Sequence, residues 1–395
     1  MQRFSSIFSQ LLQLFPRSEF EQAVRQHAAE RHVRGFPCWG QFIAMLFCQL
    51  GQAHSLREIC GGLAATEGKL KHLGLSAAPK RSTLAYANEH RPWQLYETVF
   101  QQLLAKCQHW VAQRGGGKKF RFHNRLLGLD ASVIDLSLSL YDWAQFQRTK
   151  GAVKLHLLLD HDGYLPSFAV VTNGNTADLK VARQLRWEAG TILVFDRGYT
   201  DYEWFIELGR QKVFFVTRLK KNASYEVVER REAPRGSSPV VRDEVIYFPS
   251  HAEASRECFF RRVEVEDPDN GERLVFLTNH LKLSATTVAA IYRERWQVEL
   301  LFKALKQNLR LKTFVGVSAN AVRTQVFTAL IAMLLLRYLQ LRARYGWSLS
   351  NLAALLRQQL FMYRDLWGWL NEPFEPPPQL AAAAEQLALP LPARS

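Results

Sequence analysis

Two hydrophobic runs in the middle of this chain of 395 residues each lead directly into an aspartate. Residues 126–129 (LLGL) precede Asp130, and residues 191–195 (TILVF) precede Asp196. Each run has the length and apolar content of a buried strand, as in sheets covered on both faces. Functional groups in open α/β sheets gather near the carboxyl ends of strands. We therefore predict an α/β fold that displays both aspartates at a sheet edge, although either one alone could simply cap a turn or helix.

A third acid lies on an amphipathic helix predicted between Ile291 and Leu309. At about 100° per residue, six polar or aromatic side chains share a stripe roughly 100° wide, beside an apolar face that can pack on a core. These are Tyr292, Arg295, Trp296, Glu299, Lys303 and Lys306. The bland alternative is a ladder of surface ion pairs, each contributing about 0.2–0.5 kcal/mol. Glu294 projects roughly 140° away from Glu299, so we expect it to lie outside the site and to matter much less.

Three carboxylates that converge are suited to a pair of hard divalent cations. Mg²⁺ and Mn²⁺ prefer oxygen ligands and usually bridge protein carboxylates to substrate phosphates. Two such ions, about 3.5–4 Å apart, support in-line displacement at phosphorus. Asp130, Asp196 and Glu299 thus predict phosphodiester chemistry with two Mg²⁺ or Mn²⁺ ions.

This arrangement resembles a known family, the DDE transposases of bacterial insertion sequences, in the group with a Tyr-Arg-Glu-Lys signature. The resemblance spans roughly residues 120–310 and is carried by Asp130, Asp196 in FDRGY, and the spacing Tyr292-x2-Arg295-x3-Glu299-x6-Lys306. It implies a ribonuclease-H-like fold whose catalytic, metal-binding triad is Asp130, Asp196 and Glu299. It also implies DNA contacts by Tyr292, Arg295 and Lys306, with Trp296 holding a distorted or flipped base.

Net charge supports a polyanionic partner. Lysine and arginine number 51 against 36 acidic residues, which gives a formal net charge of +15. Residues 114–125 contain three consecutive glycines and several cations but no acid, and this predicts a basic hinge. We expect Lys118, Lys119 and Arg121 of the hinge, and Lys303 of the helix, to contact DNA. No phosphate-cradling GxxxxGK[ST] loop follows a strand there.

The order of the patterns predicts a mixed α/β protein of several parts. A helical N-terminal domain precedes the hinge, a ribonuclease-H-like core is split by a β-rich insertion, and a helical C-terminal region with a tail ends the chain. The predicted parts are 1–113 (helical domain), 114–125 (hinge), 126–219 (core, first part), 220–272 (insertion), 273–340 (core, second part) and 341–395 (C-terminal region).

The helical domain offers weaker DNA-binding candidates. Ser55 is predicted to cap a helix, with Glu58 three residues later. Lys80 and Arg81 at a helix start, with Arg91, could belong to a reader of DNA ends, or the domain could be a scaffold that never touches DNA. In the core, His156 and Asp178 could support the site, or they could be an ordinary core histidine and an acid in a helix first turn.

Neither an extracellular location nor a membrane partner is predicted. The five cysteines are scattered without CxxC pairs, which favours reduced thiols in the cytoplasm. The first 20 residues lack the features of a secretory signal. Residues 326–336 are the longest uncharged apolar stretch, far short of the roughly 20 residues that span a bilayer, and they predict a core helix.

The resemblance implies a cytoplasmic, nucleoid-associated transposase that acts as a homodimer on DNA. It would bind the terminal inverted repeats of its element and join them to target DNA, by cut-and-paste through a hairpin intermediate to which the β-rich insertion contributes. Two alternatives stay open: a ribonuclease-H-like endonuclease that cuts without joining, and an inactive DNA-binding regulator derived from a transposase.

Overall fold

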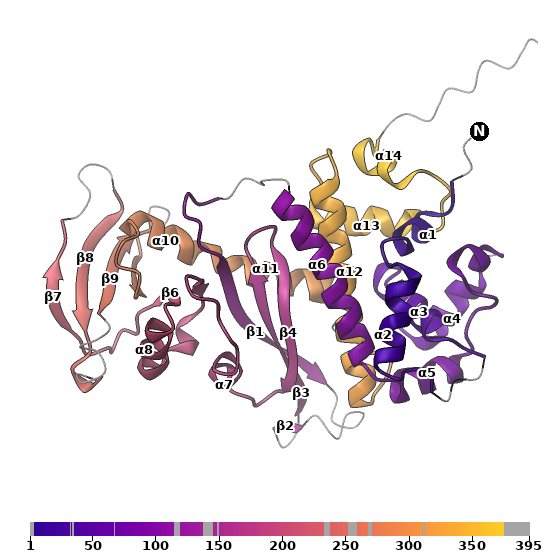
Figure 1. Cartoon of the computed structure of the whole chain (residues 1–395), viewed down its shortest axis with the longest axis horizontal. Coiled ribbons are helices and arrows are strands. Elements are labelled where there is room, and N and C mark those ends of the chain that lie inside the picture. Colours follow the sequence, from indigo (N-terminus) through magenta and orange to yellow (C-terminus); the bar gives the residue numbers. More distant parts are fainter. Residues whose placement is uncertain are drawn as a thin grey trace, which may run out of the picture.

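A helical domain and a large mixed sheet lie side by side in the computed structural model, with long helices between them (Figure 1). The structure is thus mixed α/β, as predicted. It describes residues 4–31, 33, 35–66, 68–113, 119–136, 145–147, 150–232, 238–251, 259–267, 271–309, 311 and 313–374.

The N-terminal domain is helical, as its sequence predicts. Its elements are α1 (Ile7–Leu12), α2 (Arg17–Gln26), α3 (Cys38–Leu50), α4 (Leu56–Ala64), the 3-10 helix η1 (Lys69–Leu73), α5 (Arg81–His90) and α6 (Gln94–Gln113). Ser55 caps α4 as predicted, because its hydroxyl accepts a hydrogen bond from the Glu58 amide at 3.2 Å. The prediction for Arg91 is wrong. Its guanidinium is buried and donates to the Gln41 side chain and the Phe36 carbonyl, so it holds α5 to the domain and is not free for DNA.

Ten strands within the described residues form one sheet. They are β1 (Leu126–Leu136), β2 (Gln145–Gln147), β3 (Lys150–Asp160), β4 (Leu165–Asn173), β5 (Ile192–Val194), β6 (Phe214–Arg218), β7 (Glu226–Arg230), β8 (Val240–Tyr247), β9 (Phe260–Glu266) and β10 (Arg273–Thr278). Their order is β2-β3-β1-β5-β6-β10-β9-β8-β7, with β4 also paired to β3. The pairs β1–β5 and β5–β6 are parallel and the others antiparallel, which is the mixed sheet of a ribonuclease-H-like core.

Strand β1 does not end at Asp130, contrary to the prediction. It continues to Leu136 because β3 pairs with it over its whole length, up to Leu136 opposite Gly151. Its parallel pairing with β5, however, stops at Gly128 opposite Val194. Asp130 therefore lies just beyond the carboxyl end of β5, where Asp196 also emerges, although it lies in mid-strand on β1.

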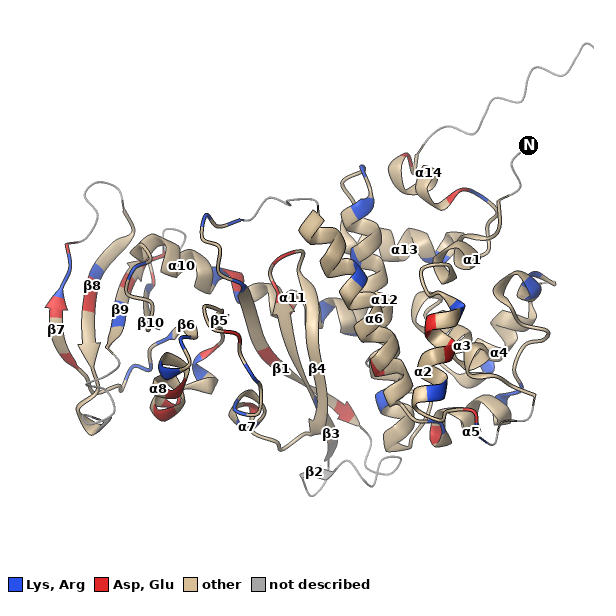
Figure 2. Cartoon of the chain, viewed as in Figure 1, with Lys and Arg blue, Asp and Glu red and all other residues tan. Residues whose placement is uncertain are grey.

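The predicted insertion is β-rich and extends the same sheet. Strands β7, β8 and β9 continue outward from β10 to the far end of the molecule in Figure 1. Acidic bands on β8 lie beside basic bands on β9 in Figure 2. Arg261 Nη2 lies 2.6 Å from Asp243 Oδ2, and Arg262 Nη1 lies 2.9 Å from Glu244 Oε2, all four side chains being buried. Buried charges need such partners, so these pairs hold the two strands in register.

Helices cover both faces of the sheet. The helices after β4 are α7 (Asp178–Ala182), the 3-10 helix η2 (Arg197–Tyr199), α8 (Tyr202–Arg210), the 3-10 helix η3 (Pro249–His251), α10 (Ala285–Glu294), α11 (Trp296–Gln307), α12 (Ala319–Arg342), α13 (Leu349–Gln359) and α14 (Leu366–Asn371), of which the last two lie beside the helical N-terminal domain. Helix α8 packs on β6, α10 packs on β5, β6 and β10, and α11 packs on β1 and β3.

The helix predicted from Ile291 to Leu309 is two helices that meet at Arg295. The Arg295 amide donates to the Tyr292 carbonyl, and the Val298 amide donates to the Arg295 carbonyl, each bond spanning three residues. This tighter turn resembles a 3-10 turn and changes the direction of the side chains that follow. Tyr292 and Glu299 consequently lie on separate helices.

Helix α12 joins the helical domain to the sheet. It contacts α3, α5 and α6 on one side and β4 and α11 on the other. By length and composition it could cross a membrane, but 83% of its most apolar window is buried inside the protein. It is the core helix that residues 326–336 predict, and its burial makes the helical domain and the sheet share one hydrophobic core.

Gly128 allows α11 to approach β1 closely. A Cβ atom at this position would lie 2.6 Å from Val298 Cγ2 and 2.9 Å from His161 Nε2. Real side chains do not tolerate such distances, so only glycine permits this packing. The contact matters for function because Asp130 follows Gly128 by two residues and Glu299 follows Val298 by one.

We predict that Gly128→Ala destabilises the protein by about 1–3 kcal/mol through overpacking, and that Val298→Ala in the same chain restores part of the loss. Urea unfolding of the single and double variants measures both effects. Gly61→Ala is the control, because a Cβ there meets no atom within 4 Å and alanine is favoured in a helix such as α4. Equal stability of Gly128→Ala and the wild type would contradict this account of the packing.

Candidate active site

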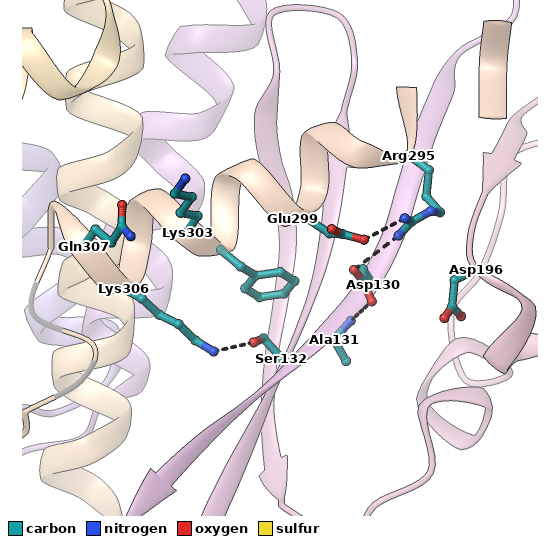
Figure 3. Close-up of a pocket in the computed structure, with 10 residues that line it drawn as sticks. Asp130, Ala131, Ser132, Asp196, Arg295, Glu299, Lys303, Lys306 and Gln307 are labelled. Atoms are coloured by element: carbon teal, nitrogen blue, oxygen red, sulfur yellow. Dashed lines mark hydrogen bonds and ion pairs between the residues drawn. The ribbon is translucent and has the colours of Figure 1, made fainter. Parts of the chain in front are cut away.

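The three predicted acids line one open cavity of about 470 Å³ between α11 and the sheet (Figure 3). Its lining residues are Asp130, Ala131, Ser132, Asp196, Arg295, Glu299, Phe302, Lys303, Lys306 and Gln307. The structure therefore brings together side chains more than 160 residues apart in the chain.

Each acid is held by a different element. Asp130 extends from the middle of β1, and its Oδ1 accepts a hydrogen bond from the Ala131 amide at 2.8 Å. Asp196 follows β5 and caps η2, where its Oδ1 accepts from the Gly198 amide at 2.8 Å. Glu299 lies in the first turn of α11, where the positive end of the helix dipole stabilises a carboxylate.

The guanidinium of Arg295 lies between two of the acids. Its Nη2 is 2.6 Å from Glu299 Oε1, and its Nη1 is 4.0 Å from Asp130 Oδ2. Figure 3 shows Asp196 on the other side of Asp130, away from this ion pair. Arg295 thus compensates the charge of Glu299 and part of that of Asp130.

The pKa of Asp130 reports how much negative charge gathers here. Burial above all, together with the neighbouring carboxylates of Asp196 and Glu299, raises this pKa from 3.8 to about 6. The Ala131 amide and Arg295 act in the opposite direction but do not cancel the effect. The ionised form of Asp130 is therefore costly in this site until a further positive charge arrives.

The opposite end of the cavity is cationic. Lys306 Nζ donates to Ser132 Oγ at 2.7 Å and to the Val133 carbonyl at 3.1 Å, which fixes it against β1 just beyond Asp130. Lys303 lies beside it and is exposed (Figure 3). Trp296 begins α11 with 54% of its surface exposed. The cavity thus runs from an acidic end to a basic end, next to an exposed aromatic ring.

Tyr292 is not part of the cavity lining. Its ring packs against Phe276, with centroids 5.0 Å apart, and lies 5.7 Å from the guanidinium carbon of Arg295. Tyr292 therefore lies against Arg295 but does not itself line the cavity.

Of the three hinge cations expected to contact DNA, one is already paired with an acid of the protein. Lys118 lies outside the described residues. Lys119 pairs with the carboxylate of Glu294, and Arg121 is exposed. The direction predicted for Glu294 is confirmed, because its carboxylate lies among Lys119 and Tyr164 and does not line the cavity. Glu294 is only 3% exposed, however, so replacing it removes a buried charge. The expectation that its replacement matters much less than that of Glu299 considered only its direction on the helix.

Asp178, Lys154 and His156 form a second polar cluster in the core. Asp178 Oδ1 lies 2.9 Å from Lys154 Nζ and 3.6 Å from His156 Nδ1. Burial lowers the pKa of His156 to about 4, so its ring is neutral near pH 7. His156 is opposite Ala131 in the sheet, one position from Asp130. Neither residue lines the cavity, and a supporting role for them in the site stays a prediction.

Sequence reasoning missed the roles of Ser132 and Tyr199. Ser132 orients Lys306, and no pattern in the sequence signals this contact. Tyr199 is buried, and its hydroxyl makes no hydrogen bond within the described part of the chain. Its pKa is raised by burial and then by the carboxylates of Asp178, Asp130 and Asp196. Its place in FDRGY, three residues after Asp196, was the available signal.

The donor set fits hard divalent cations. Asp130 and Asp196 offer carboxylate oxygens without a cation between them in Figure 3, and a cation bound there would stabilise the ionised form of Asp130, whose pKa burial and the neighbouring carboxylates raise. Across the described residues, no three His, Cys, Asp or Glu side chains are close enough to share one ion. At this site the third acid, Glu299, is paired with Arg295.

Much of this chain is similar in sequence to known proteins. The family described as "Transposase DDE domain" matches residues 123–335, and the family described as "Domain of unknown function (DUF4372)" matches residues 3–76. Transposase y4zB of Sinorhizobium fredii is 32% identical over 313 residues, which cover 78% of this chain and 85% of that protein. A transposase for insertion sequence element IS5377 of Geobacillus stearothermophilus is 30% identical, covering 65% and 67%. The piggyBac transposase in a synaptic complex with hairpin DNA is a distant structural match, with a TM-score of 0.44 and 10% identity over 91% of this chain and 83% of that one.

We predict that Asp130→Asn stabilises the protein near pH 7 when divalent ions are removed with a chelator. The folded state raises the pKa of Asp130, so the penalty for ionising it is absent below about pH 4 and complete above about pH 6. The gain should be on the order of 2 kcal/mol above pH 6 and vanish toward pH 4. Urea unfolding at several pH values measures it. Asp135→Asn, an exposed site on the same strand, should show no such trend; a gain for Asp130→Asn that does not depend on pH would contradict the electrostatic origin.

Proposed function

This chain belongs to the DDE transposase family, and on that premise we propose that it cuts and joins DNA at the ends of its own insertion sequence with Asp130, Asp196 and Glu299 as the catalytic triad. The observation that carries the proposal is the convergence of these acids in one cavity whose other end is basic. DNA is thus the proposed partner, both as terminal inverted repeats and as target.

The polarity of the cavity fits a phosphodiester. Lys303 and Lys306 can receive the phosphates of a strand that lies along α11, while its reacting phosphorus sits near the acids. Trp296 is proposed to stack on a base displaced from that strand, and the exposure of its ring at the start of the same helix supports this role. Arg121 and Lys118 of the hinge are proposed to contact the backbone further along, as is Lys119 if it leaves Glu294.

Two Mg²⁺ or Mn²⁺ ions held there would activate the attacking oxygen and stabilise the leaving oxygen. Asp130 and Asp196 would hold them together with Glu299, once the arginine that pairs with Glu299 turns toward a DNA phosphate. Arg295 can make this exchange because its guanidinium already borders both the acids and the cavity. Carboxylate and phosphate are similar partners for its planar fork of donors.

The proposed reaction has two kinds of step. Water attacks the phosphorus at the element end, and the bond to the 3′ oxygen breaks, which leaves a free 3′-hydroxyl and a 5′-phosphate. The 3′-hydroxyl then attacks another phosphodiester and displaces its 3′ oxygen, so that one bond forms for each bond broken. In the cut-and-paste scheme of the Tyr-Arg-Glu-Lys group, the first such attack closes a hairpin on the element, and a homodimer brings two ends together.

Two other activities would leave part of this scheme intact. An endonuclease of the same fold would free the 3′-hydroxyl but would not join it to target DNA. An inactive regulator would bind the ends without cutting. A labelled terminal-repeat duplex, incubated with the protein, Mg²⁺ and plasmid target, distinguishes the three by its products: joined DNA, a nick alone, or intact duplex.

We predict that Asp130→Asn, Asp196→Asn and Glu299→Gln each lower the cleavage rate of this duplex by at least about 1,000-fold, because each removes a carboxylate that stabilises charge in the transition state. Binding of the duplex, measured by fluorescence anisotropy in Ca²⁺, should change little. Asp135→Asn is the matched control, since this exposed acid lies on the same strand as Asp130. Normal cleavage by any of the three variants removes that residue from the triad.

We predict that Lys306→Ala weakens binding of the terminal-repeat duplex and reduces the slope of log K against log salt by about one. The physical reason is the loss of one phosphate contact. Lys106→Ala serves as the control, because Lys106 already pairs with Glu19 at 2.7 Å. An unchanged salt slope for Lys306→Ala would show that this lysine only braces Ser132.

A further inference from the structure

Glu294 is a buried carboxylate next to the catalytic cavity but not in it. It ends α10, directly before Arg295, and only 4% of its side chain is exposed. An ionised group at this depth is costly unless it is paired. The reaction itself does not use this residue, so its partners must explain its presence.

Its partners come from two segments distant in sequence. The Tyr164 hydroxyl donates to Oε2 at 3.0 Å, and Lys119 Nζ binds Oε1. The ring of His161 faces the same carboxylate, with Nδ1 3.7 Å from Oε2. These contacts, His161 first, lower the pKa of Glu294 to about 2, so it is ionised at neutral pH.

The turn that carries two of these partners is itself firmly placed. It joins β3 to β4, and Tyr164 adopts a positive φ of 53°, which a non-glycine residue keeps only where its surroundings favour it. The guanidinium carbon of Arg337, on α12, lies 6.0 Å from the Tyr164 ring. His161 fills the space that the missing Cβ of Gly128 leaves. Glu294 is therefore tied to the core through the β3–β4 turn.

We propose that Glu294 is a positioning residue that fixes the junction of α10 and α11, and thereby aims Arg295 and Glu299 at Asp130. This inference rests on the proposed function. The junction needs such an anchor because Arg295 occupies a tightened turn, where a small rotation would move its guanidinium. Through Lys119, the same carboxylate also ties the end of the basic hinge to the catalytic helix.

The substitution Glu294→Gln tests the proposal because it keeps the shape of the side chain and removes its charge. We expect single-turnover cleavage of a labelled terminal-repeat duplex in Mg²⁺ to slow by about tenfold to 100-fold, as misplaced groups do. The dissociation constant for the duplex should change by less than about threefold, a small difference in binding free energy. Hydrogen exchange of amides at residues 294–299 should become faster in the protein without DNA.

Asp243→Asn is the matched control. It also removes a buried charge from an ion pair, with Arg261, but on β8 of the insertion. We expect a comparable loss of thermal stability without faster exchange at residues 294–299. If both variants slow cleavage equally at equal loss of stability, Glu294 serves stability alone and the proposal is wrong.

Tyr164→Phe keeps the experiment decisive if Glu294→Gln does not fold. It removes one hydrogen bond to the carboxylate and should give a smaller change in the same direction in both cleavage and exchange. Unchanged exchange and cleavage in this variant overturn the proposal. A wild-type protein that never cleaves would instead refute the proposed function, while the exchange measurement still tests the anchor.

Discussion

The close packing of α11 on β1 at Gly128 is the constraint on which the site depends. Val298 lies where a side chain at Gly128 would be, so the helix backbone comes nearer to the strand than any other residue would allow. Glu299 and Asp130 follow these two contact points by one and two residues. Their distance is therefore set by packing in the core, and the proposed chemistry would take place at the rim of that contact.

The same packing buries the charge of Asp130, and this has an electrostatic cost. Burial and neighbouring carboxylates raise the pKa of Asp130 to about 6, and one arginine compensates the charge only in part. Sites that bind ions or transition states commonly store such unfavourable charge, at a cost in stability. Glu294 represents the opposite case, since it is fully paired and its pKa is lowered to about 2. One acid thus carries an unfavourable charge in the middle of β1, and the other is held by its partners at the end of α10.

Much of the fold was predictable because a strong hydrophobic period in a short segment is enough to indicate a strand or a helix. The strands that lead toward Asp130 and Asp196, the helix capped by Ser55 and the core helix over residues 326–336 all formed as expected. The errors arose where tertiary contacts override local pattern. Pairing with β3 carried β1 past Asp130, a tightened turn at Arg295 divided the catalytic helix, and contacts with Gln41 and Phe36 buried Arg91.

The sequence by itself determined which acids could be catalytic, because the period of an apolar strand and the spacing along a helix limit where a carboxylate can point. It also indicated that Glu294 faces away from Glu299. Only the tertiary structure decided that the pairing of β1 with β5 stops just before Asp130. It also decided that Ser132 accepts a hydrogen bond from Lys306 and that Lys119 pairs with Glu294. These relations join residues that are distant in the chain, and no local period encodes a contact whose two partners are brought together only by the folded core.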